Sequence, residues 1–424
     1  MISRIRLRLL ADYIAATRNE IAVDEMFLAL SKVDAVDVGY FPRVPHWISF
    51  AKRQPNLVRL VFHIARVVWL GGGAAIFFVL EYFKFRRLHR ITHVDQLPRH
   101  DGAVLYLSKR VGDVLNPTQF PAFPRIWFTL PWVPPQGIQK GVAELPMLSV
   151  LRVQDLREAL VDAMIVTHRR RRKQRLSPWV LQTYTAFRWF LVRRALNCLS
   201  GTLVTSEHYD RWAVLVDRTV REHRRVSCST ARLVLVQHGA MTGLNQELPL
   251  RKSLLQLPTR LRQVDELHVY NSDEAAAFEA HVFAPGRAAP MPEVYFFKPL
   301  IELRGSPFSE HQRLLFVGHP LCEGFQIEIF QRLKACRNVE VYYKPHPTAP
   351  MSKLIEALDW VLIRDVNYFP KVDLLVSYPS TLVVEYEGVG IPASVHPLDV
   401  AVDDAPLFFE KTLAIIDGRL EGLR

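Results

Sequence analysis

The sequence has 424 residues, of which 49% are hydrophobic, 23% charged and 11% aromatic. This composition excludes a disordered chain, a collagen and a coiled coil, and the length predicts two or three globular domains. The net charge of +12 is unevenly divided, because residues 1–200 carry 30 Lys and Arg against 14 Asp and Glu, whereas residues 201–424 carry 24 against 28. A basic first half indicates an anionic partner surface, such as nucleic acid, anionic lipid or an acidic polymer.

The cysteines are few and widely spaced. The chain has four, without a C-x-x-C pair: Cys198, Cys228, Cys322 and Cys336. This spacing is typical neither of a zinc ribbon nor of a disulfide framework. We expect reduced, buried thiols, which fits a cytosolic protein.

An apolar segment runs from Leu57 to Phe85, and its uncharged core, Val67 to Leu80, has 14 residues. A bilayer span needs about 20 apolar residues, so we expect no full span. Glycines 71–73 weaken a helix in water, and four cations follow where lipid head groups would lie: Lys84, Arg86, Arg87 and Arg90. We expect monotopic attachment to the inner face of the cytoplasmic membrane; the alternative is a buried helix of the first domain.

Two further basic stretches bear on the partner. Met1 to Leu10 is too short and too interrupted by arginines to be a signal peptide. Residues 169–175 form a cationic cluster that precedes an aromatic, helix-like stretch, Leu176 to Leu199. The chain has no zinc-finger spacing and no RRM-type aromatic string, so we expect lipid or an anionic glycan and no nucleic acid.

From about residue 100 onward the pattern alternates short apolar runs with helical stretches, which predicts an α/β fold with parallel sheets. The predicted strands are Leu105 and its neighbours, Gly201 to Thr205, Leu233 to Val236, Leu314 to Val317, Val339 to Tyr343 and Leu374 to Val376. The predicted helices are Arg211 to Arg224, Phe325 to Cys336, Met351 to Leu358 and Thr381 to Val389.

This alternation predicts two Rossmann-like lobes that face a cleft. We expect a basic, apolar helical segment at residues 1–90, a first lobe for the acceptor at 91–290 and a second lobe for the donor at 291–424. The turn-rich stretch Ala284 to Pro292 is the expected linker between the lobes.

Polar clusters follow the predicted strands, at the edge where open parallel sheets bind ligands. The first lobe has Glu207, His208 and Asp210 after one strand and Gln237, His238 and Gly239 after another. The second lobe has Gly318, His319 and Pro320, then Lys344, Pro345, His346 and Pro347, then Ser377, Tyr378, Pro379, Ser380 and Thr381.

The last of these clusters opens a predicted helix. Ser380 and Thr381 are ordinary capping residues, but a helix N-terminus also binds phosphate. A cation and an imidazole, Lys344 and His346, follow an adjacent strand, and Glu385 lies one turn into the helix, where a carboxylate accepts hydrogen bonds from ribose hydroxyls. The combination indicates a nucleotide site.

Over residues 200–400 these motifs, together with Gly390 and Pro392, resemble bacterial surface-polysaccharide glycosyltransferases of the GT-B type, which build capsule and lipopolysaccharide. The most similar members use CMP-Kdo or CMP-sialic acid; polysialyltransferases and CDP-glycerol polyol-phosphate transferases are nearby. The resemblance implies transfer of a sugar from a nucleotide-sugar to a membrane-linked glycan or glycolipid, with phosphate contacts from His346, Ser377, Ser380 and Thr381. Tyr378 and Pro379 separate the serines, which relatives often have adjacent.

Glycosyl transfer needs a base for the acceptor hydroxyl and neutralisation of the departing phosphate. The candidate bases are Glu207, Asp210, His208 and His238, and Glu207 ranks first because a carboxylate at a strand end can face the cleft. Asp210 is as well placed to cap the following helix. The chain has no D-x-D triplet, which argues against a metal-dependent GT-A enzyme, so we expect no metal and no cofactor beyond the nucleotide-sugar substrate.

Two other functions fit the same pattern. A UDP-sugar 2-epimerase shares the two lobes and the phosphate site but has no need of a basic apolar front segment. A non-catalytic, membrane-associated scaffold of polysaccharide assembly with a degenerate donor site is the alternative from another class.

Overall fold

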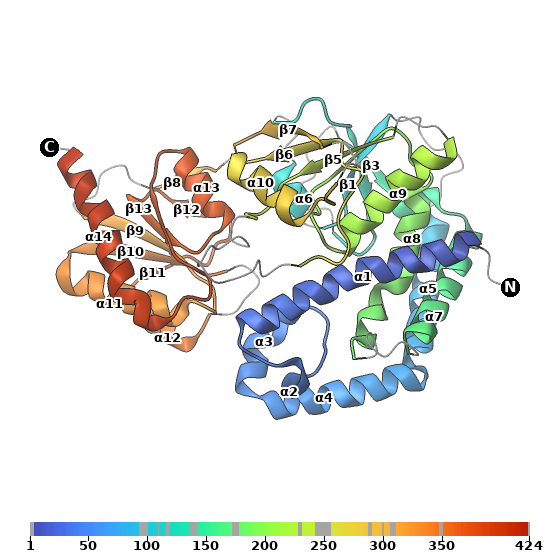
Figure 1. Ribbon diagram of the computed structural model, residues 1–424, viewed down its shortest axis with the longest axis horizontal. Coiled ribbons are helices and arrows are strands. Elements are labelled where there is room, and N and C mark those ends of the chain that lie inside the picture. The colour runs from blue at the N-terminus through green and yellow to red at the C-terminus, as the bar shows by residue number, and fades with distance from the viewer. Residues whose placement is uncertain are drawn as a thin grey trace.

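The structure is a computed structural model, which describes residues 4–92, 101–108, 110–115, 119–134, 142–171, 178–227, 231–241, 256–286, 291–298, 301–305, 311–346 and 351–422. Two parallel sheets form separate lobes, and a layer of helices packs beside the first (Figure 1). The expected α/β architecture, with two lobes of parallel sheet and N-terminal helices, is confirmed. Pro347 lies outside the described residues.

The first lobe has a seven-stranded sheet of order β3-β2-β1-β4-β5-β6-β7, with every pair parallel. Its strands are β1 (Gly102–Tyr106), β2 (Ile126–Thr129), β3 (Ala143–Pro146), β4 (Thr202–Thr205), β5 (Arg232–Val236), β6 (Glu266–Val269) and β7 (Glu293–Phe296). Because side chains alternate along a strand, Leu105 packs with the main helical core, whereas Val104 and Tyr106 pack on the opposite face.

The second lobe has a five-stranded parallel sheet of order β11-β10-β9-β13-β14 and a small sheet of two strands. The strands are β8 (Leu303–Arg304), β9 (Gln312–Val317), β10 (Val339–Lys344), β11 (Val361–Leu362), β12 (Phe369–Pro370), β13 (Leu374–Ser377) and β14 (Ala393–Val395). Helices α11 and α14 pack on one face of the larger sheet, and Tyr386 of α13 packs on the other.

The helices cover both sheets and build the layer beside the first. Before the first sheet they are α1 (Arg4–Leu30), α2 (Ala35–Val38), α3 (Val44–Arg53), α4 (Pro55–Val68), a π-helical turn (Trp69–Gly73) and α5 (Ala74–Thr92). The first lobe adds α6 (Arg110–Val114), α7 (Val153–Arg171), α8 (Ala186–Leu196), α9 (Arg211–Ser227) and α10 (Ser272–His281). The second lobe adds α11 (Glu323–Cys336), α12 (Lys353–Glu356), α13 (Thr381–Gly388) and α14 (Ala405–Gly422).

The first 90 residues share a core with the first lobe. Tyr13 of α1 and Phe78 and Phe85 of α5 are fully buried in the same cluster as the inner side chains of the first sheet. Tyr13 contacts the ring of Trp189 in α8 at a centroid distance of 5.3 Å. The two sequence ranges 1–90 and 91–290 therefore pack as one body.

The predicted linker at Ala284 to Pro292 is wrong. β7 begins at Glu293 and pairs with β6, so the first sheet continues beyond residue 290. The chain passes to the second sheet after Phe296. The predicted helix Met351 to Leu358 is also shorter than expected, because α12 has only four residues, Lys353–Glu356.

Candidate functional site

The carboxyl ends of the strands of the two lobes meet where the loop after β5 faces the start of α13. A Cβ built on Gly239 would lie 3.9 Å from Oγ1 of Thr381, which is ordinary contact distance. The hydroxyl of Tyr270, which follows β6, is close enough to Thr381 and Glu385 for both side chains to influence its pKa. Residues that follow β5 and β6 therefore lie beside the first turn of α13, and we call the junction of these strand ends the cleft.

On the first-lobe side, His208 and His238 form a stacked pair. Their ring centroids lie 4.0 Å apart, and the backbone N–H of His238 donates to Nε2 of His208 at 3.0 Å. Nδ1 of His238 hydrogen-bonds to the carbonyl of Ser206, so Nδ1 carries the proton and Nε2 is the basic nitrogen of the neutral ring. His208 is buried, whereas His238 is half-buried beside the cleft residue Gly239.

Glu207 and Asp210, in the same segment as His208, are two interacting carboxyl groups. Burial, then the charge of Glu207, raises the pKa of Asp210 well above its usual range, and a hydrogen bond between the side chains adds to the effect. Asp210 also caps α9, because its Oδ1 accepts from the N–H groups of Trp212 and Ala213, each at 2.8 Å. The capping interpretation of Asp210 is confirmed.

Glu207 is only 3% exposed, and its Oε1 is buried without a hydrogen-bond partner in the described structure. A buried carboxylate oxygen in this state has the capacity to accept a further donor. Glu207 is, however, more buried than the half-exposed His238. This geometry moves His238 ahead of Glu207 as the group that can meet an acceptor hydroxyl.

A buried polar network holds the start of α9 against α1. Arg211, 3% exposed, pairs with Glu20 at 3.2 Å and donates to Oε1 of Gln182 at 2.7 Å. Burial alone would raise the pKa of Glu20 and lower that of Arg211, but the attraction between the two outweighs burial and shifts each pKa the other way. The network fixes the segment that carries Glu207 and Asp210.

Two residues that contact the expected candidate Gln237 were not predicted from the sequence: Glu274 in α10 and Tyr270 after β6. Gln237 donates to Oε2 of Glu274 at 2.6 Å and accepts from the backbone N–H of Tyr270 at 3.0 Å. Glu274 also accepts from the N–H of Met241 at 2.6 Å. These contacts shape the loop that presents His238 and Gly239. Tyr270 follows a strand, β6, that was absent from the predicted elements.

On the second-lobe side, the hydroxyls of Ser377 and Ser380 lie 3.1 Å apart, although Tyr378 and Pro379 separate them in the sequence. Ser380 is the residue before α13, and its side chain makes no capping hydrogen bond. The loop therefore brings both hydroxyls together at a helix N-terminus, where backbone N–H groups and the helix dipole favour an anion.

Glu385 lies one turn into α13, as the sequence predicts. Burial raises the pKa of its carboxyl to about 7, with Lys344 acting in the opposite direction. The side chain therefore changes charge near neutral pH.

The structure favours a structural role for Lys344 over the predicted neutralisation of the donor phosphate. The Nζ group donates to three backbone carbonyls, those of Asp365 at 3.0 Å, Val366 at 2.9 Å and Tyr368 at 2.9 Å. It also lies 4.6 Å from the centre of the Phe369 ring. All three ammonium protons are thus used, and Lys344 holds the loop between β11 and β12 against β10.

His319 and His346 are brought together, but with different properties. Their rings make an edge contact at 5.2 Å, and the ring of Tyr378 lies 5.5 Å from His319. Burial, and then His346, lowers the pKa of His319 to about 3, so His319 stays neutral at working pH. His346 and the α13 N-terminus are then the described groups best placed to meet a phosphate.

Gly318 is required by packing, whatever ligand the cleft holds. A Cβ at this position would lie 2.0 Å from the hydroxyl oxygen of Tyr343. Any larger residue would therefore displace Tyr343, which stacks on Trp360 in the core of the second lobe.

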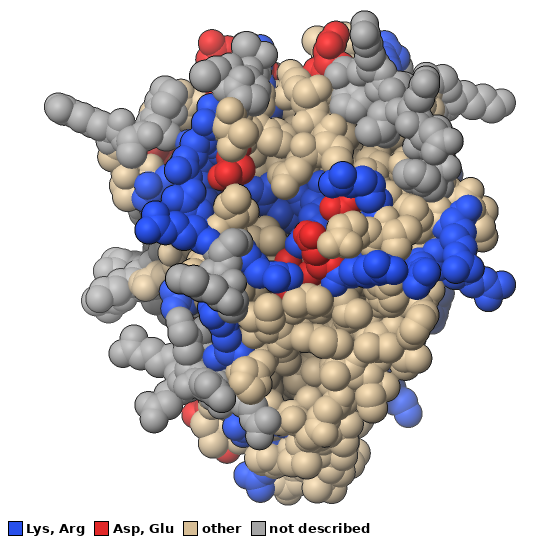
Figure 2. All heavy atoms as spheres, turned by 90° about the vertical axis from the view of Figure 1, so that its right-hand side faces the viewer, with Lys and Arg blue, Asp and Glu red and all other residues tan. Residues whose placement is uncertain are grey.

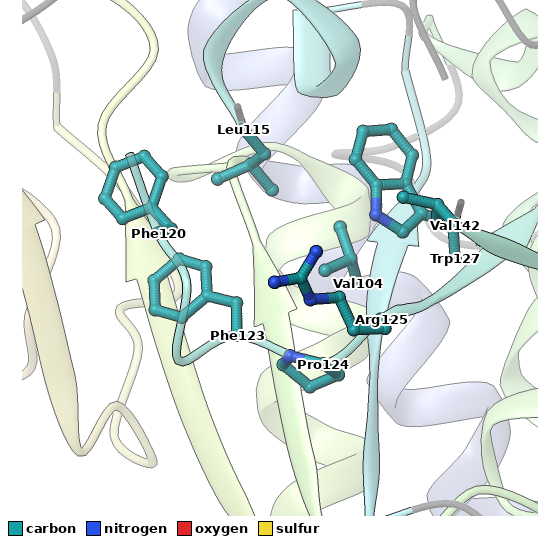
Figure 3. Close-up of a pocket in the computed structure, with 8 residues that line it drawn as sticks. All are labelled: Val104, Leu115, Phe120, Phe123, Pro124, Arg125, Trp127 and Val142. Carbon is teal, nitrogen blue, oxygen red and sulfur yellow. The ribbon is translucent and has the colours of Figure 1, made fainter. Parts of the chain in front are cut away.

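Two hollows away from this cleft belong to the first lobe alone. Figure 3 shows the first hollow, where the side chain of Arg125 extends among apolar groups. The volume of this hollow, about 10 Å³, has room for about one water. Its lining consists of Val104, Leu115, Phe120, Phe123, Pro124, Arg125, Trp127 and Val142. The second, about 300 Å³, lies between α10 and β7.

Within the described ranges, no three or more His, Cys, Asp or Glu gather as a metal site, and metal independence stays a prediction.

Comparisons with known proteins leave the family open. No family model matches the chain, and no curated protein matches it. Among solved structures, the apo form of the lipopolysaccharide outer core galactosyltransferase WaaB is similar over 75% of this chain and 90% of its own, with 10% identity and a TM-score of 0.37. Similarity at this level does not define an activity.

Proposed function

We propose that the chain is a glycosyltransferase that moves a sugar from a nucleotide-sugar to a membrane-linked glycan or glycolipid. The observation that carries the proposal is the meeting of the two lobes at the start of α13: the hydroxyls of Ser377 and Ser380 lie 3.1 Å apart there, and the next residue, Thr381, lies beside Gly239 of the loop that carries His238. One side suits a phosphate and the other supplies a base.

In this proposal the second lobe receives the leaving nucleotide. Negative charge builds on the phosphate as the bond from the anomeric carbon to the phosphate oxygen breaks. The α13 N-terminus, the hydroxyls of Ser377 and Ser380 and the imidazole of His346 stabilise that charge. Glu385, one turn further along α13, accepts hydrogen bonds from the ribose.

His238 takes the proton of the acceptor hydroxyl while the acceptor oxygen bonds to the anomeric carbon. Its Nδ1 is held by the carbonyl of Ser206, so Nε2 receives the proton and later passes it to solvent. His208, stacked behind it, holds the ring orientation. We therefore propose His238 as the base in place of Glu207, which the sequence pattern favoured.

CMP-Kdo or CMP-sialic acid is the donor we favour, from the resemblance of the motifs over residues 200–400. We place the reaction at the inner face of the cytoplasmic membrane. The described cysteines, Cys198, Cys322 and Cys336, are free thiols, which suits a reducing compartment, although only Cys322 is buried as expected and the other two are exposed.

Transfer from CMP-sugars to a lipid-linked acceptor, with CDP-glycerol and UDP-sugars run in parallel and chelator present throughout, tests the proposal. We expect transfer from one donor, and a loss of about 10² to 10³ in the His346→Ala and Ser380→Ala variants. Epimerised UDP-sugar without an acceptor, or nucleotide binding without any transfer, would contradict it.

A further inference from the structure

Helix α4 presents an apolar face that no other part of the described structure covers. Val58 and Phe62 are buried on the inner side, where Phe62 contacts the ring of Phe41 at 5.4 Å. The opposite side carries six exposed apolar residues at helical spacing: Leu57, Leu60, Val61, Ile64, Val67 and Val68. A soluble helix normally places polar groups on this side.

Helix α5 has an exposed stripe whose character changes partway along. Ile76, Leu80 and Phe83 follow at i, i+4 and i+7, and all are exposed. The same stripe then becomes cationic, with Lys84 four residues after Leu80 and Arg87 four after Phe83. At 1.5 Å per residue, Ile76 and Arg87 lie about 16 Å apart along the axis, which is close to half the roughly 30 Å hydrocarbon core of a bilayer.

The turn between the two helices is open to its surroundings. Gly72 has φ 127°, a conformation that favours glycine, and no protein atom lies within 4 Å of a Cβ built on Gly71 or Gly72. Taken together, the two helices and the turn, Pro55–Thr92, are long and apolar enough to span a membrane by length and composition alone, and only 11% of the most apolar window is buried. Most of this window is therefore exposed, whereas the inner face of α5 is buried in the core of the first lobe.

The inner side of α5 fixes this surface to the first lobe. Phe78, Tyr82 and Phe85 are buried, and Glu81 accepts from Nε of Arg188 in α8 at 2.8 Å. At the turn, Nε1 of Trp69 donates to Oγ1 of Thr183 at 3.0 Å. The exposed side chains are thus held in place by a packed inner face.

Figure 2 shows the side of the molecule where α5 lies: a broad surface with few charged side chains occupies the lower part, and Lys and Arg side chains, with some Asp and Glu, lie across the middle. We name the exposed apolar residues of α4 and α5, with the turn between them, the apolar corner. Its cationic border includes Arg59 and Arg66 of α4 and Lys84, Arg87 and Arg90 of α5.

We propose that the apolar corner inserts into one leaflet of an anionic bilayer, without crossing it, and that its cationic border rests among the lipid head groups. Three observations favour lipid over a second copy of the chain or another protein. The face is apolar along both helices, the apolar length of α5 matches one leaflet, and the charge at the border is complementary to anionic lipid. This inference stands on the surface alone and does not depend on the chemistry proposed for the cleft.

Flotation of the full chain with vesicles of phosphatidylcholine, with and without phosphatidylglycerol, tests the insertion. Leu80→Glu in α5 and its matched control Leu407→Glu in α14 change leucines of nearly equal exposure, 64% and 67%. We expect binding that favours anionic vesicles, a loss of about tenfold or more in Leu80→Glu, and parental binding in Leu407→Glu. Lys84→Glu with Arg87→Glu should remove the preference for anionic vesicles.

Thermal melting and nucleotide titration of each variant separate loss of insertion from misfolding and from failure of the cleft proposal. Equal vesicle binding by the parent and Leu80→Glu overturns the inference, as does a parent that binds neither kind of vesicle. A parent that is dimeric in solution and becomes monomeric in Leu80→Glu also overturns it, because the apolar corner is then an interface between two copies.

Discussion

The imidazole of His238 stacks on that of His208 at 4.0 Å, and the backbone N–H of His238 donates to the ring of its partner. The two residues follow neighbouring parallel strands, β4 and β5, so the sheet register brings them together. One ring is buried and the other is half-buried at the cleft. We therefore predict that His238 reacts with the acceptor and that His208 positions the His238 ring.

His238→Ala should lower transfer by about 10² to 10⁴, the usual contribution of a positioned base, with the nucleotide dissociation constant nearly unchanged. His208→Ala should cost less, because it only frees the His238 ring to reorient. Single-turnover transfer and nucleotide titration of both variants check this, together with the pH profile of transfer. Full activity in His238→Ala would remove it from the reaction.

Glu207→Gln should retain most of the activity if His238 is the base, and Asp210→Asn should retain both folding and activity, since Asn also caps helices. Asp210→Ala should lose the cap of α9 and about 1 kcal/mol of unfolding free energy. Denaturant melts and single-turnover assays measure the two effects. An inactive, folded Glu207→Gln beside an active His238→Ala would return the base to Glu207.

Lys344→Met should destabilise the second lobe, because three carbonyls of the loop between β11 and β12 would lose the donor that holds this loop against β10. We expect a loss of about 3 kcal/mol of unfolding free energy, with the nucleotide dissociation constant of the folded variant nearly parental. Denaturant titration and nucleotide titration of one preparation measure both. A stable variant that no longer binds nucleotide would show that Lys344 meets the donor after all.

The pH dependence of nucleotide binding should report the ionisation of Glu385. Burial raises the pKa of this carboxyl to about 7, so the carboxylate that accepts ribose hydrogen bonds forms as pH rises through that value. Nucleotide affinity should therefore increase between about pH 6 and pH 8, and more in the parent than in Glu385→Gln. Because the phosphate of the nucleotide titrates with both proteins, the difference between the parent and Glu385→Gln isolates the effect of the carboxylate. A smaller increase in the parent would mean that the carboxylate faces the phosphate instead.

Local sequence patterns predicted the individual strands and helices and the residues at their ends. The order of small and hydroxyl residues at Ser377 to Thr381 is the signature of a helix start, and α13 begins there. The alternation of strands and helices likewise predicted both parallel sheets. Each of these features depends on residues within a few positions of one another.

The features that the sequence did not predict depend on contacts between segments that are distant in the chain. Lys344 looked like a free cation because the carbonyls that satisfy it lie 21 to 24 residues further along the chain. Glu20 and Arg211 are separated by 191 residues, and their pairing leaves no sequence pattern. Tyr270 was missed because β6 has four residues, two of them polar. The stacking of His208 on His238 follows only from the strand register.

Calorimetric titration of CMP into the parent and into Ser380→Ala tests the central claim most directly, with CDP, UDP and GDP as comparisons. The hydroxyl pair at the start of α13 predicts that the parent binds a nucleotide, with CMP favoured, and that Ser380→Ala binds it about tenfold more weakly while melting at the parental temperature. Absence of binding by all four nucleotides, or equal affinity in the parent and Ser380→Ala, would contradict the assignment of this cleft to a nucleotide-sugar.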